Sequence, residues 1–117
     1  MAAHSAKGRF VVVSTTLDSA QAAARMANRI VRSRLAACVQ RLPIRSTYWW
    51  KGRIENAPEH LLLAKTRSAL AAPLAALIAR HHSYEVPEIT VTPIAGGSDA
   101  YLAWIREETA PRKSGRR

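Results

Sequence analysis

The side chains best suited to chemistry are concentrated in one short segment. It runs from His81 to Glu88 and reads His-His-Ser-Tyr-Glu-Val-Pro-Glu. Imidazole binds transition metals and titrates near neutral pH, and it also interacts favourably with the dipole at a helix C-terminus. Adjacent histidines diverge by about 100° on a helix and by about 180° on a strand, so His81 and His82 are not expected to hold one ion unaided. Helix capping, a ligand pocket and metal binding all stay open as roles.

Two further side chains could bind a ligand. Cys38 is the single cysteine, and its thiolate is a soft metal ligand, although no CxxC or CxH motif accompanies it. The alternative role is a small buried core residue. Lys65 follows three leucines and an alanine in a predicted strand, so its ammonium group must reach solvent, an acid or an anion. Either Glu59 or Glu88 could form a salt bridge with it, and anion binding is the alternative.

Aromatic side chains gather at one predicted hairpin. Tyr48, Trp49 and Trp50 stand together before Lys51-Gly52, where glycine allows the positive φ of a tight turn. Alternation along a strand puts Tyr48 and Trp50 on one face and Trp49 on the other. One small domain cannot cover both faces of such a tip, which suggests a partner surface or a ligand pocket; ordinary core with one exposed aromatic residue is the alternative.

The composition indicates one globular domain. The chain has 117 residues, 48% of them hydrophobic, and a single cysteine, which fits a reducing compartment and excludes an internal disulfide. No apolar run is long enough for a signal peptide or a membrane span, so we expect a cytoplasmic protein that does not enter a membrane. No GxSxG, P-loop, HExxH or Gly-rich dinucleotide turn is present, and we predict that the protein is not an enzyme.

Much of the positive charge lies outside the predicted fold. The net charge is +10, but residues 110–117 are rich in Arg and Lys and poor in apolar groups, and we expect a solvated tail that adds little to stability. Basic residues also precede the first strand. Because no nucleic-acid motif accompanies the charge, we do not expect specific nucleic-acid binding. The predicted folded part is about 10–108.

The order of predicted elements indicates the fold. Strands are expected over 10–16, from about 38 to Trp50 with a bulge or edge position at Pro43, over 61–66 after Pro58, and over 89–92. Helices are expected after a cap at Thr16 or Asp18, after Ser68 or near Pro73, and after a cap at Ser98, with Gly96-Gly97 as a turn. Right-handed crossovers give an α+β ferredoxin-like βαββαβ fold with an extra C-terminal helix.

The strand sequences imply a second covered face. Val11 to Val13 and Leu61 to Leu63 are apolar without alternation, while the two main helices cover one face of the sheet. The chain has too little left to cover the other. We therefore predict self-association through the sheet.

Several motifs together resemble the CutA divalent-cation tolerance family. They cover about residues 10 to 108 in the family's order and comprise Thr15-Thr16, 34–39, 46–54, Glu59, Lys65-Thr66, 81–89 and 101–105. The resemblance implies a ferredoxin-like subunit in a homotrimer, similar in architecture to PII-type signalling proteins. It also implies tolerance of divalent metals, above all copper, with Cys38 and His81 or His82 as the metal ligands.

Two positions depart from the family's pattern. Ser14 stands where some bacterial members have a second cysteine, and a hydroxyl is a poor ligand for cuprous ion. Ser83 takes the place of the proline in the family's usual His-Pro-Tyr motif, and the loss of that proline loosens the loop between His82 and Tyr84. Copper is still the metal that the resemblance favours, but Ser14 in place of a cysteine weakens the expected ligand set.

Three functional hypotheses follow. The first is a non-enzymatic homotrimer in the response to divalent metal ions, the second is a PII-like sensor of a small anion or metabolite in the inter-subunit cleft, and the third is a scaffold for a partner. For the first two we predict a pocket in which the hairpin of one chain reaches the loop of the next. Its residues would be Tyr48, Trp50, Lys65, Tyr84 and Glu88, with His82 beside them.

Overall fold

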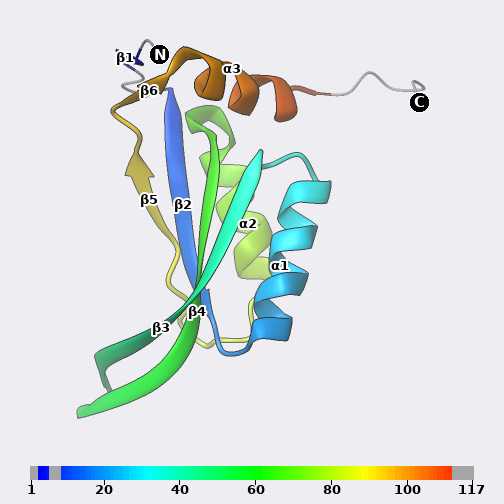
Figure 1. Ribbon diagram of the computed structural model, residues 1–117. Helices are drawn as coiled ribbons and strands as arrows, with labels where there is room; N and C mark the ends of the chain where they lie inside the picture. Colours follow the sequence, from blue (N-terminus) through cyan, green and yellow to red (C-terminus); the bar gives the residue numbers. More distant parts are fainter. Residues whose placement is uncertain (1–2, 6–8, 112–117) are drawn as a thin grey trace.

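The computed structural model describes residues 3–5 and 9–111, and its centre is a four-stranded antiparallel sheet. The strands are β2 (Phe10–Leu17), β3 (Cys38–Trp50), β4 (Arg53–Arg67) and β5 (Thr90–Pro93), in the spatial order β3-β4-β2-β5. Helices α1 (Ala20–Arg32) and α2 (Ala71–His81) cover one face, and α3 (Asp99–Glu108) crosses one end of the sheet (Figure 1). The predicted α+β fold and its βαββαβ order are confirmed.

Helix α1 begins at a different cap from the one predicted. The side chain of Ser19, rather than Thr16 or Asp18, accepts a hydrogen bond from the backbone N–H of Ala22, at 3.0 Å. Thr16 is still paired with Leu61 in the sheet and cannot cap the helix from there. The buried side of α1 consists of Ala23, Met26 and Ile30, whose spacing of three and four residues is that of one helix face.

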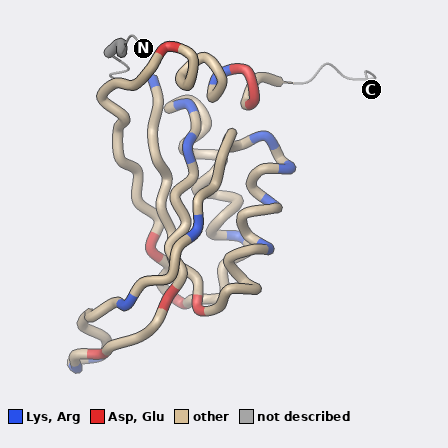
Figure 2. Tube along the Cα trace, viewed as in Figure 1, with Lys and Arg blue, Asp and Glu red and all other residues tan. Residues whose placement is uncertain are grey.

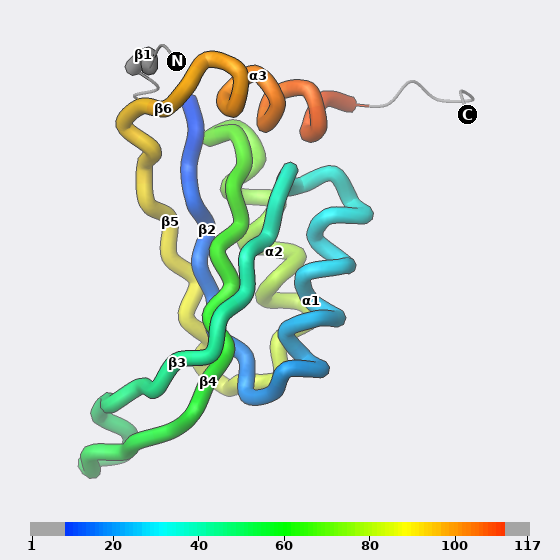
Figure 3. Tube along the Cα trace, in the orientation of Figure 1, coloured from blue at the N-terminus to red at the C-terminus, as the bar shows by residue number. Residues whose placement is uncertain are grey.

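Strands β3 and β4 form one long hairpin. Their pairing runs without a break from Cys38 opposite Lys65 to Trp50 opposite Arg53. The turn has φ values of 50° at Lys51 and 79° at Gly52, which match the right-handed twist of the strands. The hairpin extends well beyond the helices (Figure 3).

Two prolines lie inside this hairpin. Pro43 is opposite His60 in a continuous register, so it does not produce a bulge; β3 is the edge strand, the position in which proline is tolerated. Pro58 lies opposite Arg45 inside β4, which is therefore longer than the predicted return strand.

Helix α2 follows a short 3-10 turn. This turn, η1, spans Ser68–Leu70, and α2 starts at Ala71 without a side-chain cap. Pro73 thus falls in the first turn of α2, where its missing N–H would have no intrahelical acceptor. The α-helix thus begins near Pro73, one of the two alternatives left open by the sequence, and Ser68 is part of the preceding 3-10 turn rather than a cap.

The predicted turn at Gly96-Gly97 is wrong. Gly96–Ser98 forms strand β6, which pairs antiparallel with β1 (Ala3–Ser5). A local sequence pattern cannot reveal this pairing, because the two strands are about ninety residues apart in the chain. The cap that follows is as predicted: Ser98 Oγ accepts from the N–H of Tyr101 at 3.3 Å.

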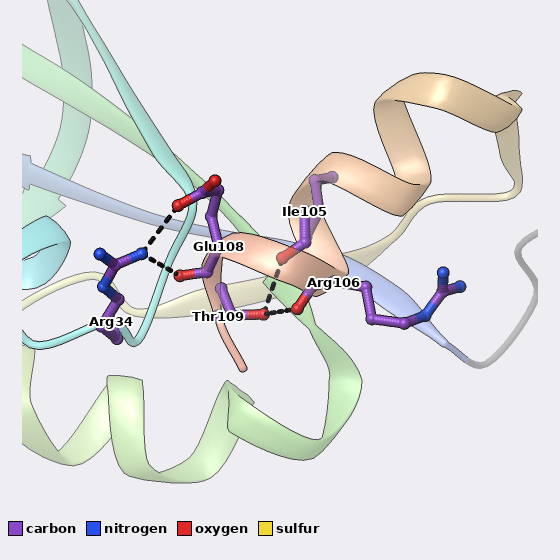
Figure 4. Close-up of polar contacts among 5 residues, drawn as sticks. All are labelled: Arg34, Ile105, Arg106, Glu108 and Thr109. Atoms are coloured by element: carbon purple, nitrogen blue, oxygen red, sulfur yellow. Dashed lines mark hydrogen bonds and ion pairs between the residues drawn. The ribbon is translucent and has the colours of Figure 1, made fainter. Parts of the chain in front are cut away.

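The far end of α3 is tied to two other elements. Arg34 donates from one nitrogen to the Glu108 carboxylate at 2.7 Å and to the Glu108 carbonyl at 3.1 Å (Figure 4). Thr109 is 3% exposed and accepts from Arg67 at the end of β4. Ordered contacts therefore reach past residue 108. Most of the predicted basic tail, residues 112–117, lies outside the described residues.

The apolar side chains of the sheet face two ways. Val11, Val13 and Leu62 are buried under α1 and α2. On the opposite face, Phe10 packs under α3 with Leu102 and Ile105. Val12, Leu61 and Leu63 on that face are only partly buried, and Leu42 is 39% exposed. We call these four residues the open sheet face.

Candidate metal and ligand sites

The root of the long hairpin carries the best-organised polar cluster. His82 ends α2 in an extended conformation, and its Nε2 lies 2.8 Å from the carbonyl oxygen of Thr16. Its Nδ1 accepts from the backbone N–H of Tyr84 at 3.1 Å. A ring nitrogen that accepts from N–H carries no proton, so the neutral imidazole has its proton on Nε2 and donates it to Thr16. Both ring nitrogens of His82 are thus engaged within the chain.

Tyr84 connects this histidine to a buried carboxylate. Its hydroxyl donates to Glu59 Oε2 at 2.8 Å, and its ring centroid lies 4.8 Å from that of His82. Desolvation, the hydrogen bond to Glu59, and the charges of Glu59, Asp18 and Tyr48 raise the pKa of Tyr84 well above its usual range. The phenol therefore stays protonated and remains a hydrogen-bond donor at all ordinary pH values.

Glu59 was not among the predicted site residues. It is only 9% exposed, and Tyr84 is its hydrogen-bond donor. Strand alternation puts Glu59 on the same face as the partly buried Leu61 and Leu63, and a carboxylate at an apolar strand position is the signal that could have identified it. We call His82, Tyr84 and Glu59 the hairpin-root cluster.

Cys38 and Lys65 lie toward the other end of the sheet. They face each other in the β3–β4 register, and Lys65 is paired in turn with Val12 of β2. Thr16, which contacts His82, is four residues further along β2, or about 13 Å away along the strand. One chain thus does not bring Cys38 together with His82.

Lys65 does not form the salt bridge that its surroundings suggested. Its Nζ lies 5.5 Å from the ring centroid of Tyr101 on α3, a cation–π contact. Glu59 is six residues away along the same strand, or about 20 Å, which is out of reach of the ammonium group. Within the described residues, neither Glu59 nor Glu88 forms an ion pair with Lys65.

His81 makes none of the contacts that join the hairpin-root cluster. It is exposed and lines a hollow of about 320 Å³ together with Arg25, Arg29 and Asp18. Desolvation first, and then the charges of Arg29 and Arg80, lower the pKa of His81 below 6.5. A lowered pKa favours the neutral imidazole that metal binding requires, but the guanidinium groups of Arg25 and Arg29 in the lining of the hollow repel a cation.

The remaining predicted pocket residues are spread over the surface. Tyr48 is 41% exposed and is the one that lies near Tyr84. Trp50 is at the hairpin tip, where the Lys51 Nζ lies 5.5 Å from its ring. Glu88 is exposed and accepts from the Thr90 hydroxyl at 3.2 Å. The structure thus joins Tyr48, Tyr84 and His82, and it leaves Trp50 and Lys65 apart from them.

No closed metal site exists within the described part of one chain. Among residues 3–5 and 9–111, no group of three or more His, Cys, Asp or Glu side chains is arranged to hold an ion. Cys38 is a half-buried free thiol. None of the helices in these ranges has the length and apolar composition needed to cross a membrane.

Comparison with known proteins gives a consistent result. A family model described as "CutA1 divalent ion tolerance protein" matches residues 11–108. The chain is similar to the chloroplastic protein CutA of Arabidopsis thaliana, at 43% identity over 100 residues, 85% of this chain and 55% of that relative. The chain thus spans about half the length of that curated relative.

Two solved structures have the same fold over nearly all of the described chain. CutA from Synechococcus elongatus PCC7942 has a TM-score of 0.89 at 28% identity, covering 93% of this chain and 96% of that one. The periplasmic divalent cation tolerance protein CutA from Archaeoglobus fulgidus has a TM-score of 0.84 at 38% identity, covering 86% and 99%.

Proposed function

Because the chain belongs to the CutA1 divalent ion tolerance protein family, we propose that it acts in the response to and tolerance of divalent metal ions. The observation that carries this proposal is the family match over residues 11–108, which includes the whole four-stranded sheet except Phe10. We assign no catalytic residue. The family is named for tolerance, and the clusters described above are explained by hydrogen bonding within the fold.

The proposed working form is a homotrimer. The support is the open sheet face, where Val12, Leu61 and Leu63 are partly buried and Leu42 is 39% exposed, beside a hairpin that projects from the domain. Association would bury apolar area at about 25 cal/mol per Å². Light scattering of the intact protein at micromolar concentration should give about three times the chain mass of 12.9 kDa. A monomer there would refute this part of the proposal.

The proposed metal ligands are Cys38, His81 and His82, with copper as the favoured ion. Since Cys38 and His82 do not meet within one chain, an ion bound by both would need them from different subunits. His81 is the more available histidine, because both ring nitrogens of His82 are already engaged. Cys38 supplies the one soft donor in the set, which suits cuprous ion.

Calorimetry on matched variants tests this ligand set. We expect copper to bind the native protein and the affinity to fall in Cys38→Ser and in His81→Ala, and to fall further at a pH below about 6.5 as imidazole takes up a proton. His60→Ala is the matched control, since His60 is a half-buried histidine outside the set. If both substitutions leave copper affinity unchanged while His60→Ala lowers it, the ligand set is wrong.

Two other expectations remain predictions. The comparisons give no support to a PII-like metabolite sensor, and all the matches described above carry the CutA name. A cytoplasmic location also stays a prediction, because the matched relatives include proteins named as chloroplastic and as periplasmic.

A further inference from the structure

A second hollow, remote from the hairpin-root cluster, is lined by three arginines. It has a volume of about 320 Å³ and lies where the start of β2, the end of β4, η1 and α3 meet. Its lining consists of Arg9, Phe10, Arg67, Ser68, Ala69 and Arg106. No Asp or Glu is part of this lining. Figure 2 shows basic residues near this end of the sheet and along α1, and acidic residues on α3 at the same end.

The fold holds Arg67 in position. Its Nε donates to Thr109 Oγ1 at 2.9 Å, and its Nη2 donates to the Thr109 carbonyl at 2.8 Å. Thr109 is itself buried and donates to the carbonyl of Ile105 at 2.7 Å (Figure 4). One edge of the guanidinium is therefore fixed by the end of α3. Nη1 makes no hydrogen bond to the described part of the chain and is the nitrogen left for a ligand.

Arg106 and Arg9 complete the hollow from two other elements. The Arg106 guanidinium carbon lies 5.3 Å from the ring centroid of Phe10, which is 1% exposed. The Arg106 side chain extends away from the Arg34–Glu108 ion pair, so it is not neutralised there (Figure 4). Arg9 is joined to η1 by its carbonyl, which accepts from the Ser68 N–H at 2.8 Å.

Three guanidinium groups in one hollow favour an anion. Arginine is always charged, and its planar fork of N–H donors matches the oxygens of a phosphate group. Backbone pairing, Thr109 and the Phe10 ring already restrict where the arginines lie, so less conformational entropy is lost when an anion binds. The volume is at the lower end of the range for small-molecule sites, about 300–1,000 Å³, and exceeds the space that a phosphate ion alone would fill.

We propose that this hollow binds a small phosphate monoester, with the phosphate held by Arg67 and Arg106 and the organic part against the exposed Ala69. The site is independent of the proposed metal ligands, since Cys38, His81 and His82 are not in its lining. It gives the protein a small-molecule site of its own, whatever ion it binds elsewhere.

Calorimetric titration with phenyl phosphate tests the proposal on the intact protein. We expect saturable binding to the native chain and an affinity about tenfold lower in Arg106→Gln, which removes one charged donor. Arg32→Gln is the matched control, because it removes the same charge from the exposed surface of α1, outside the hollow. Its affinity should stay within about twofold of native. Backbone amide signals of Ser68 and Ala69 should shift during the titration.

Three results would overturn the proposal. The first is no saturable binding of phenyl phosphate to the native protein. The second is an equal loss of affinity in Arg32→Gln and Arg106→Gln, which would mean attraction by net charge alone. The third is equal affinity for inorganic phosphate and phenyl phosphate, which would remove the organic part of the ligand. Far-UV circular dichroism should show that Arg106→Gln is folded, as expected for an exposed side chain.

Discussion

Removing the Tyr84 hydroxyl is the sharpest test of the hairpin-root cluster. That hydroxyl donates to Glu59 Oε2 at 2.8 Å, and Glu59 is 9% exposed. Tyr84→Phe keeps the ring that packs 4.8 Å from His82 and deletes only the oxygen. The carboxylate of Glu59 then loses this donor in a place where little water can replace it.

The expected cost follows from the charge and the burial of Glu59. A hydrogen bond to a charged group contributes about 1.5–3 kcal/mol, and an unsatisfied buried acceptor costs a similar amount. Because Tyr84 is only partly buried, some water can enter after the substitution, so we expect the free energy of unfolding to fall by about 1.5–2 kcal/mol. The assay is urea unfolding at pH 7 and one fixed protein concentration, since association would make stability depend on concentration.

Tyr101→Phe is the matched control. It deletes the same atom from a tyrosine that is 38% exposed and whose hydroxyl makes no hydrogen bond to the described residues. We expect a change within about 0.5 kcal/mol. A double-mutant cycle with Glu59→Gln then isolates the pair. If Tyr84→Phe costs no more than Tyr101→Phe, or the coupling to Glu59 is below about 0.5 kcal/mol, the reasoning about the buried carboxylate is refuted.

The other predictions concern pH and association. The raised pKa of Tyr84 means that the folded state holds the phenol proton more tightly than the unfolded state, so stability should fall as pH rises above about 10. Unfolding curves at alkaline pH should show a smaller fall in Tyr84→Phe. The pKa of His81 is lowered in the folded state, so its effect on stability runs the other way, and stability should fall as pH drops below about 6.5. In Arg29→Gln, NMR titration should show the pKa of His81 rising toward its usual value. An unchanged pKa would remove Arg29 as a cause. If the open sheet face is the contact between subunits, Leu63→Arg should lower the mass measured by light scattering. Val31→Arg should leave the mass unchanged, because Val31 lies on α1 and is already 42% exposed. Equal masses for both variants would contradict the use of this face.

The sequence alone determined the class of fold and the order of the four strands of the main sheet and the three α-helices. Apolar runs such as Val11 to Val13 and the helical spacing of Ala23, Ala27 and Ile30 are local patterns, and a strand or helix follows from them directly. The hairpin turn at Gly52 and the cap at Ser98 depend on a few adjacent residues. The sequence also indicated that one face of the sheet stays apolar and uncovered, because alternation is absent from both central strands.

What depends on distance in space was decided by the tertiary structure. Strand β6 exists only because its partner comes from the other end of the chain, and Lys65 meets Tyr101 rather than an acid because strand geometry keeps Glu59 about 20 Å away. The sequence left capping, a ligand pocket and metal binding open as roles for His82, and the fold brings a Thr16 carbonyl and the Tyr84 N–H to its two nitrogens. A residue's type sets which bonds it can make, but packing alone decides which groups come within bonding distance, and a site consists of those groups.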